Sequence, residues 1–362
     1  MLKKTTFVLA LMLVCTMGLM AQVKYSNEFL AIGVGARGLA MGGAQAASVQ
    51  DAYAGYWNTA GLTRIKGNLQ IAAMHNSYFG NIAKFDYGSI AAKLDDNRAI
   101  GFSIMRFGID DIPNTLDLVD ASGNLNYDRV KSFSAADYAF LFSYAKKTGI
   151  AGLGYGGNVK LIHRKVGDFA KAWGFGLDAA VQYEKGSWQL AIVGKDITST
   201  FNAWSYSNSD QLIDVFSITG NEIPENSSEI TLPRLVLGAG YLAKIGSKIT
   251  LQPELNFDLT FDGKRNTLIS SDPVSIDPKV GVELGYNNFI FIRGGVNNIQ
   301  KVIEISNASS TILQPSIGIG LKLKNFYIDY ALSNAGGNDL PASNIFSIKL
   351  DIYKTKQATN KL

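Results

Sequence analysis

The sequence contains very little cysteine and histidine. Among its 362 residues there is one cysteine, Cys15, and there are two histidines, His75 and His163. Cys15 lies in an N-terminal stretch that we expect to be removed, so the mature chain would hold no thiol. This excludes disulfides and zinc–thiolate sites, and two histidines are few for a transition-metal site. We therefore expect no cofactor, no metal and no enzyme activity.

A long hydrophobic run is also missing. After residue 22 no window has the ~18 uninterrupted apolar residues that a membrane helix needs. The net charge is 34 − 30 = +4, and without Lys3 and Lys4 it is 4 − 2 = +2, too small to indicate a nucleic-acid partner. Yet 47% of the residues are hydrophobic. These side chains must therefore follow another pattern.

The N-terminus has the pattern of a secretory signal peptide. Lys3 and Lys4 precede an apolar run over residues 7–14, and Leu19-Met20-Ala21 is a plausible cleavage site. The run is too short to span a bilayer as a helix. Cys15 lies inside the run rather than after a small residue, so we reject lipidation. Residues 1–21 are expected to be removed on export.

Residues 68–353 predict fourteen β-strands joined alternately by short and long connections. This alternation is typical of a transmembrane β-barrel with periplasmic turns and outer loops, and an even strand count returns both chain ends to the periplasm. We predict an all-β fold, a 14-stranded antiparallel barrel in the bacterial outer membrane, in contact with lipid. The expected turns lie at 95–97, 148–150, 185–186, 246–247, 287–288 and 324–325, and the expected loops at 77–83, 108–132, 166–171, 197–230, 263–275, 297–312 and 334–343.

Individual strands alternate apolar with polar or very small residues. In residues 254–262 one face is Leu255, Phe257, Leu259 and Phe261, and the other is Glu254, Asn256, Asp258, Thr260 and Asp262. In a soluble sandwich the carboxylate face would meet bulk water, whereas in a barrel it faces the lumen. Aromatic residues near strand ends are expected to form interfacial girdles: Phe85, Tyr87, Trp173, Tyr183, Trp188, Tyr286, Phe289, Phe326 and Tyr353.

Residues 22–67 differ from the strands that follow them. They are small, apolar and rich in glycine, and Ser48 to Asp51 can cap a short helix that runs to Tyr56. We predict that this segment is a plug inside the lumen, and that 354–362 is a periplasmic tail. A periplasmic flap or a disordered leader is the alternative. Glycines on inward strand faces leave room for water or for the plug: Gly152, Gly154, Gly156, Gly174, Gly176, Gly238, Gly240, Gly318 and Gly320.

The same segment carries a family signature. Gly35-Ala36-Arg37 is followed by Met41-Gly42-Gly43-Ala44, then by Asp51, and then by Trp57-Asn58-Thr59-Ala60-Gly61-Leu62. This resembles the N-terminal pattern G-A-R-x-x-x-M-G-G-A, Asp, W-N-P-A-G-L of the PorV/PorQ family, within the wider FadL-like group of fourteen-stranded outer-membrane barrels. Thr59 replaces the proline of that pattern, which leaves the local kink in question because threonine does not restrict φ.

The resemblance implies a function in protein interaction. PorV-like members act in the type IX secretion system of Bacteroidota as shuttles or translocon partners of secreted cargo, and PorQ-like members belong to surface-attachment machinery. It therefore implies other outer-membrane or surface proteins, or secreted cargo, as partners. FadL-like relatives instead carry hydrophobic small molecules, so a transporter with a hydrophobic ligand is the alternative. A structural or envelope-assembly subunit is a third class.

Arg37 is the charge that most needs a partner. In an apolar plug a guanidinium needs a carboxylate, and the expected inward faces offer Glu254, Asp258 and Glu283. We predict that Arg37 holds the plug to the wall, and a clamp for a ligand carboxylate is the alternative. Trp57-Asn58 is expected to anchor the plug, or else to line a gate. The signature residues given a structural role are Gly35, Arg37, Met41, Gly42, Gly43, Asp51, Trp57, Asn58 and Gly61.

Three patterns of site chemistry are weak. Gly33-x-Gly35-x-x-Gly38 fits a dinucleotide fingerprint, but no βαβ alternation surrounds it, so its glycines are expected to allow tight packing. Neither histidine has a hydrolase motif beside it, and both are expected at interfaces or in loops. Asp262, Asp272 and Asp277 match no calcium-loop spacing, and we expect them on a solvated face.

The longest expected loops, 108–132 and 197–230, are the best candidate partner surfaces. The second contains many large apolar side chains, and an exposed cluster of this kind indicates an interface. Folding over the barrel mouth as a lid is the alternative. The candidate partner residues are Phe201, Trp204, Tyr206, Val215 and Phe216.

Overall fold

A computed structural model describes residues 26–78, 80–119, 123–207, 209–220, 222–303, 309–333 and 342–354. Its strands form one sheet of seventeen segments, and β1 pairs with both β2 and β17, so the sheet is closed. Three segments (β8, β9 and β11) only prolong others, which leaves 17 − 3 = 14 antiparallel wall strands. The predicted 14-stranded barrel is confirmed. The expected signal peptide and residues 355–362 of the tail lie outside the described residues.

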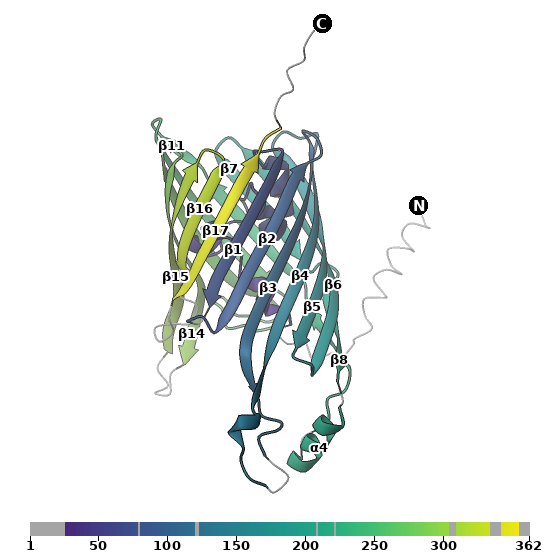
Figure 1. Ribbon diagram of the computed structural model, residues 1–362. Helices are drawn as coiled ribbons and strands as arrows, with labels where there is room; N and C mark the ends of the chain where they lie inside the picture. The colour runs from purple at the N-terminus through teal and green to yellow at the C-terminus, as the bar shows by residue number, and fades with distance from the viewer. Residues whose placement is uncertain are drawn as a thin grey trace, which may run out of the picture.

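The wall strands follow one another around the barrel in chain order (Figure 1). Among the described residues, no helix is long and apolar enough to cross a membrane. The wall strands are β1 (Leu69–Tyr78), β2 (Ala83–Lys93), β3 (Arg98–Asn114), β4 (Lys131–Lys147), β5 (Leu153–Val166), β6 (Ala170–Lys185), β7 (Trp188–Lys195), β10 (Arg234–Tyr241), β12 (Ile249–Thr260), β13 (Ser275–Tyr286), β14 (Ile290–Ile303), β15 (Ser309–Leu323), β16 (Phe326–Ser333) and β17 (Ser343–Ile352).

The expected tight turns all lie at one end, here called the turn end, and the opposite end is the loop end. Two of the expected long loops are short, because β1 ends at Tyr78 and β2 begins at Ala83, and β5 ends at Val166 and β6 begins at Ala170. Positive φ angles at Gly80, Asn81 and Gly167 allow these reversals. Connection length therefore does not alternate as strictly as the sequence predicts.

The expected loop 197–230 is largely ordered into strands and a helix. β8 (Thr200–Tyr206) continues the line of β7 beyond a bulge, and β9 (Ser227–Thr231) leads into β10. Helix α4 (Asp210–Thr219) joins them and lies beyond the loop end of the barrel (Figure 1). The segment is therefore neither a free loop nor a lid but an extension of the wall. At the turn end, β11 (Ala243–Ile245) prolongs β10.

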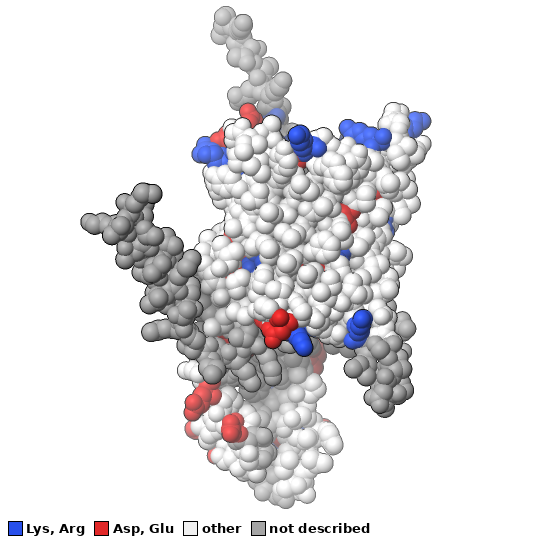
Figure 2. All heavy atoms as spheres, turned by 180° about the vertical axis from the view of Figure 1, so that it is seen from behind, with Lys and Arg blue, Asp and Glu red and all other residues white. Residues whose placement is uncertain are grey.

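The two faces of the wall differ as the alternation predicts. On β12 the inward Glu254, Asn256 and Asp258 are only 2%, 1% and 8% exposed, whereas Leu255, Phe257 and Leu259 on the other face are half-buried. Exposed aliphatic residues cover the outside of the wall, and Figure 2 shows that charged side chains are sparse between the two ends. Such a band is what contact with lipid tails requires.

Two aromatic residues assigned to the girdles lie inside instead. Phe85 is fully buried and Tyr87 is 3% exposed. Tyr87 stacks on Tyr53 of the N-terminal segment with ring centroids 5.5 Å apart, and Phe85 packs edge-on against Phe107. In β2 both faces carry mixed side chains, so alternation alone did not distinguish the inward face. Trp173, Trp188, Tyr286, Phe289 and Tyr353 are exposed as predicted.

The N-terminal segment fills the lumen as a plug (purple in Figure 1). It consists of η1 (Glu28–Ala31), α2 (Ala36–Ala40), α3 (Ala54–Trp57) and η2 (Thr59–Arg64). The expected helix from Ser48 to Tyr56 is shorter, because the chain is helical only from Ala54. Inward glycines admit the plug: a Cβ at Gly318 would lie 2.6 Å from Ala40 Cβ, and one at Gly156 2.9 Å from Ala60 N.

Candidate functional site

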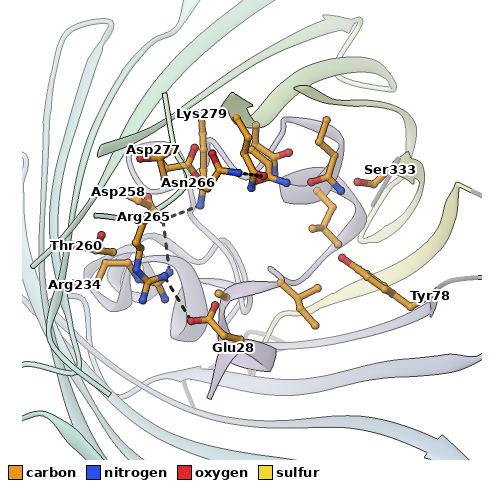
Figure 3. A pocket seen from close by; sticks show the side chains of 18 of the residues that line it. Glu28, Tyr78, Arg234, Asp258, Thr260, Arg265, Asn266, Asp277, Lys279 and Ser333 are labelled. Carbon is orange, nitrogen blue, oxygen red and sulfur yellow. Dashed lines mark hydrogen bonds and ion pairs between the residues drawn. The ribbon is translucent and has the colours of Figure 1, made fainter. Parts of the chain in front are cut away.

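A vestibule of about 410 Å³ lies on the loop-end side of the plug. The plug forms its floor, and inward side chains of the wall with the connection after β12 form its sides (Figure 3). The lining residues are Glu28, Ala31, Ile32, Leu39, Asn76, Tyr78, Arg234, Asp258, Thr260, Arg265, Asn266, Thr267, Asp277, Lys279, Asn297, Asn298, Gln300, Gln314, Ser333 and Ile345. A cavity of this size suits a small molecule.

The vestibule has two chemically different sides. Arg234 and Asp258 lie on one side, and Tyr78 and Ser333 lie on the opposite side (Figure 3). The charged side comes from β10, β12 and β13, and apolar side chains of the plug and of β17 contribute elsewhere. The cavity is thus mixed in character, not the wholly apolar pocket that a purely hydrophobic ligand would favour.

Ion pairs organise the charged side. Lys279 Nζ lies 2.7 Å from Asp258 Oδ2, and Arg234 Nη1 lies 4.0 Å from the same oxygen. Arg265 pairs with Asp262 and reaches Glu28 of the plug at 3.6 Å. Burial alone would raise the pKa of Asp262, but the hydrogen bonds and charge of Arg265 outweigh it, so this pKa lies below its usual range. These contacts tie the connection after β12 to the plug.

Lys195 and Arg234 are two lumenal cations that were not expected from the sequence. They are directly opposite each other on β7 and β10, and both face the plug. Lys195 Nζ lies 4.1 Å from the ring centre of Tyr56 and 5.9 Å from that of Trp57. The alternation of side chains along β7 and β10 could have placed each residue in the lumen. Only the pairing of the two strands shows that the residues meet.

Arg37 is paired as the sequence analysis predicts. Its Nε lies 2.8 Å from Glu283 Oε2 on β13, which confirms one of the three expected carboxylates. Glu283 also accepts from Arg293 at 2.6 Å, and Arg293 continues to Asp329 at 2.6 Å. Because the guanidinium of Arg37 binds within this network, few of its N–H donors remain for a ligand.

Glu254, another of the three expected carboxylates, binds the backbone of the plug. Glu254 Oε1 accepts from Ala47 N at 2.7 Å. Asp51 of the signature pairs with Lys349 of β17 at 2.7 Å, and Arg64 pairs with Glu184 of β6. Charged contacts therefore hold the plug to several sides of the wall.

The signature residues of the plug form close contacts. Gly42 and Gly43 have positive φ, and a Cβ at Gly42 would lie 2.6 Å from Val296 N. The backbone of Met41 lies against glycines of the wall, and a Cβ at Gly61 would lie 2.4 Å from Val49 O. Gly35 also has positive φ and lies against Tyr53. These glycines allow close packing, as expected.

Trp57 and Asn58 mainly bind backbone groups of the plug itself, and Asn58 Nδ2 also donates to Val181 O of the wall at 3.3 Å. Trp57 Nε1 donates to Val34 O at 2.8 Å, and Asn58 Nδ2 donates to Ala46 O at 2.8 Å. Thr59 stands where the family pattern has proline, and its hydroxyl donates to Asn158 Oδ1 at 3.0 Å. Asn58 caps η2 through Ala60 N, so the local turn forms without a proline.

The candidate partner residues are not uniformly exposed. Phe201 is 52% exposed on β8, but Trp204 is only 8% exposed and lies under Arg164, whose Cζ is 5.0 Å from its ring centre. Tyr206, Val215 and Phe216 are partly buried. The expected exposed cluster is therefore reduced, because β8 places alternate side chains on opposite faces of the extended wall.

The two histidines lie apart from the vestibule. His75 Nδ1 lies 2.7 Å from Asp86 on the outer face, and His163 stacks on Trp173 with centroids 4.2 Å apart. Their placement at interfaces or in loops stays a prediction. Within the described ranges, no group of three or more His, Cys, Asp or Glu side chains is arranged to hold a metal ion.

No family model matches the sequence, and no curated protein matches it. Solved structures match over most of the chain. The CymD monoaromatic hydrocarbon channel is 12% identical, with a TM-score of 0.56 over 89% of this chain and 98% of that one. The toluene transporter TbuX of Ralstonia pickettii is 13% identical (TM-score 0.53; 89% and 99%). A FadL homologue of Pseudomonas aeruginosa is 12% identical (TM-score 0.50; 88% and 98%).

The chain shares the fold of FadL-like outer-membrane transporters. At such low identity the likeness establishes the fold alone. The match extends over nearly the full length of each of these structures. The PorV/PorQ resemblance of the signature remains a prediction.

Proposed function

We propose that the protein is a FadL-like channel that passes small, partly hydrophobic molecules across the outer membrane. In this proposal the loop end faces outward, molecules enter the vestibule, and the plug is the gate. The observation that carries the proposal is the vestibule itself. It is a cavity of about 410 Å³ at the loop end of a closed barrel, and the N-terminal plug forms its floor.

The lining of the vestibule favours a molecule with both apolar and polar parts. Ala31, Ile32 and Leu39 of the plug offer apolar contact, while charged side chains line the opposite wall. The solved structures with this fold include a hydrocarbon channel and toluene transporters, which supports passage of small aromatic molecules.

Passage requires the plug to move. Beside the vestibule, three cavities between plug and wall measure only about 30, 20 and 20 Å³. Each is about the size of one water molecule. A molecule as large as toluene therefore needs the plug to shift or partly unfold.

A reversible lock on the plug tests this proposal. A Cβ at Gly238 of β10 would lie 3.2 Å from Ala46 Cβ, slightly closer than the ~3.5–4.5 Å of a disulfide, so a small shift would let Ala46→Cys and Gly238→Cys form a bond. The sequence has no cysteine after Cys15, so no other thiol competes. The bond would join the plug to the wall.

Uptake of labelled toluene by intact cells that express the barrel is the measurement. We expect the double variant to take up toluene only after reduction, and the Ala46→Cys variant to behave like the unmodified protein. Equal uptake in the locked and reduced states would rule out plug movement as the gate. Uptake no greater than in cells without the barrel would rule out the channel.

A second candidate is a protein-interaction subunit of the PorV/PorQ type. The signature favours it, and so do the projections of β3–β4 and of α4 beyond the loop end (Figure 1). Ile218 of α4 is 85% exposed. Affinity purification from native membranes in mild detergent tests it: we expect a stable complex that is lost when residues 209–226 are deleted. Recovery of the barrel alone would argue against this candidate.

A further inference from the structure

Two cations meet in register at the floor of the vestibule. Arg234 on β10 pairs directly with Lys195 on β7 in the antiparallel ladder. Directly opposed like charges destabilise a sheet. Here the cost is greater than on a surface, because both side chains point into the space between wall and plug. The arrangement therefore needs compensation by negative charge.

The neighbouring carboxylates are shared with other cations. Asp258, the nearest acid to Arg234, pairs with Lys279 at 2.7 Å and lies 4.0 Å from the guanidinium. Asp178 and Asp196 both pair with Lys160. Asp277 is opposite Asp258 on β13, one strand further from Arg234.

The donors of both cations are largely unused. Among the described residues, the Arg234 guanidinium makes one ion pair, at 4.0 Å, and no hydrogen bond. Lys195 contacts the rings of Tyr56 and Trp57 but pairs with no carboxylate among those residues. A guanidinium has five N–H donors and an ammonium has three, and burying such groups without acceptors is costly.

Arg234 is the member of the pair that can be reached from the vestibule. Arg234 lines the vestibule and also the three small cavities that adjoin the plug. Figure 3 shows Arg234 at the edge of the vestibule beside Thr260 and Asp258. Lys195 lines two of the small cavities directly behind it. A ligand that enters the vestibule therefore meets the guanidinium first.

We infer that Lys195 and Arg234 form a binding site for the carboxylate of a small organic acid. This inference rests on the proposed channel function and names the class of molecule that the vestibule selects. In the vestibule the carboxylate would accept hydrogen bonds from Arg234, and its apolar body would lie against Ile32 and Leu39 of the plug floor. The movement of the plug that the proposed channel requires would then bring the carboxylate to Lys195. An uncharged hydrocarbon would leave the two cations uncompensated.

Comparing benzoate with benzamide, which has nearly the same shape but no charge, tests whether binding depends on the negative charge. Binding to the purified full-length barrel in detergent is measured by calorimetry. We expect benzoate to bind at least tenfold more tightly than benzamide. We also expect benzoate, but not benzamide, to raise the unfolding temperature, because a ligand of the folded state stabilises it. Equal binding of the two compounds would overturn the inference.

Single variants locate the site. Arg234→Gln and Lys195→Gln are each expected to weaken benzoate binding by roughly tenfold to a hundredfold, the usual loss of a charge-assisted hydrogen bond. Arg234→Lys keeps the charge and is expected to retain most of the affinity. Lys171→Gln makes the same change of charge on the outer end of β6 and should leave binding unchanged. Unaltered benzoate binding in both glutamine variants would overturn the inference.

Folding of each variant is checked by its heat-modifiable mobility on gels. Because Lys195→Gln removes one of two opposed charges, we expect its unfolding temperature without ligand to equal or exceed that of the unmodified protein. A clear fall would argue that the pair is compensated internally and would count against the site. If toluene passes the reduced lock variant but benzoate fails to bind, the inference fails and the channel stands.

Discussion

Arg37 of the plug and Glu283 of β13 form an ion pair, with Nε and Oε2 2.8 Å apart. Both side chains are mostly buried, at 17% and 10% exposure. Glu283 also binds Arg293, so the pair joins the plug to a charge network of the wall that continues to Asp329. The plug is thus held by specific charged contacts as well as by packing.

Arg37→Ala is expected to loosen the plug. Removing one partner of a buried pair is strongly destabilising, but Glu283 would keep Arg293, so we expect a loss of about 1–3 kcal/mol. The measurements are the temperature of the heat-modifiable gel shift and the rate of proteolysis within residues 26–67. Arg98→Ala, which breaks a pair at the exposed 95–97 turn, is the control and should change little. No change in either measurement for Arg37→Ala would contradict the anchoring role.

Gly295→Ala is expected to unseat the plug. A Cβ at this position would lie 2.1 Å from Met41 C and 2.3 Å from Gly42 N, which are backbone atoms that cannot rotate away. We expect a loss of roughly 1–3 kcal/mol or more, with faster proteolysis of the plug while the barrel stays closed. Gly149→Ala has no atom within 4 Å and should behave like the unmodified protein. If the plug of Gly295→Ala resisted proteolysis as in the unmodified protein, the prediction would be wrong, and the wall would have shifted to accommodate the methyl group.

Ile317→Lys tests contact with lipid. Ile317 lies mid-way along β15 and is 62% exposed. A lysine near the bilayer midplane costs about 2–4 kcal/mol. The comparison is Ile150→Lys, equally exposed at 62% but in a turn. Urea titration of the barrel folded in lipid vesicles should show a large loss for the first variant and almost none for the second. Equal losses would mean that the outer face of β15 does not contact lipid tails.

Acid is expected to release the connection after β12 from the plug. The folded pKa of Asp262 lies below its usual value of 3.8. Its contribution to stability is therefore present above that value and is lost as pH falls through the lower, folded pKa. The protection factors of the backbone amides in residues 262–267, which compare exchange with its intrinsic rate at the same pH, should fall below about pH 4, the usual pKa of aspartate. Asp262→Asn should have low protection factors at all pH values. Protection factors that do not change with pH in the unmodified protein would refute the prediction.

Much of the architecture follows from local pattern. Alternation on β12 shows which residues face the lumen, because successive side chains of a strand point to opposite faces. Tight turns such as 95–97 and 324–325 follow from polar pairs between apolar strands. In β2, where both faces are mixed, the same reasoning wrongly placed Phe85 and Tyr87 in the outer girdles.

The partner of Arg37 could be narrowed from the sequence but not chosen. A buried guanidinium requires a carboxylate partner, and the inward faces of β12 and β13 carry three carboxylates. In the folded protein α2 packs against β14, β15 and β16, and this packing places Arg37 beside Glu283. Helix α4 and the short connections at 79–82 and 167–169 were missed, because polar composition does not distinguish an ordered excursion from a loop.

The sequence by itself determined the strands, their two faces, the turn end and the presence of a compact glycine-rich segment before the barrel. All of these depend on neighbouring residues. Only the tertiary structure decided that Lys195 faces Arg234, that the plug forms the floor of a vestibule, and which carboxylates are already paired. Those relationships depend on the register between strands distant in the chain and on barrel closure, because one slip of register would turn each side chain to the opposite face.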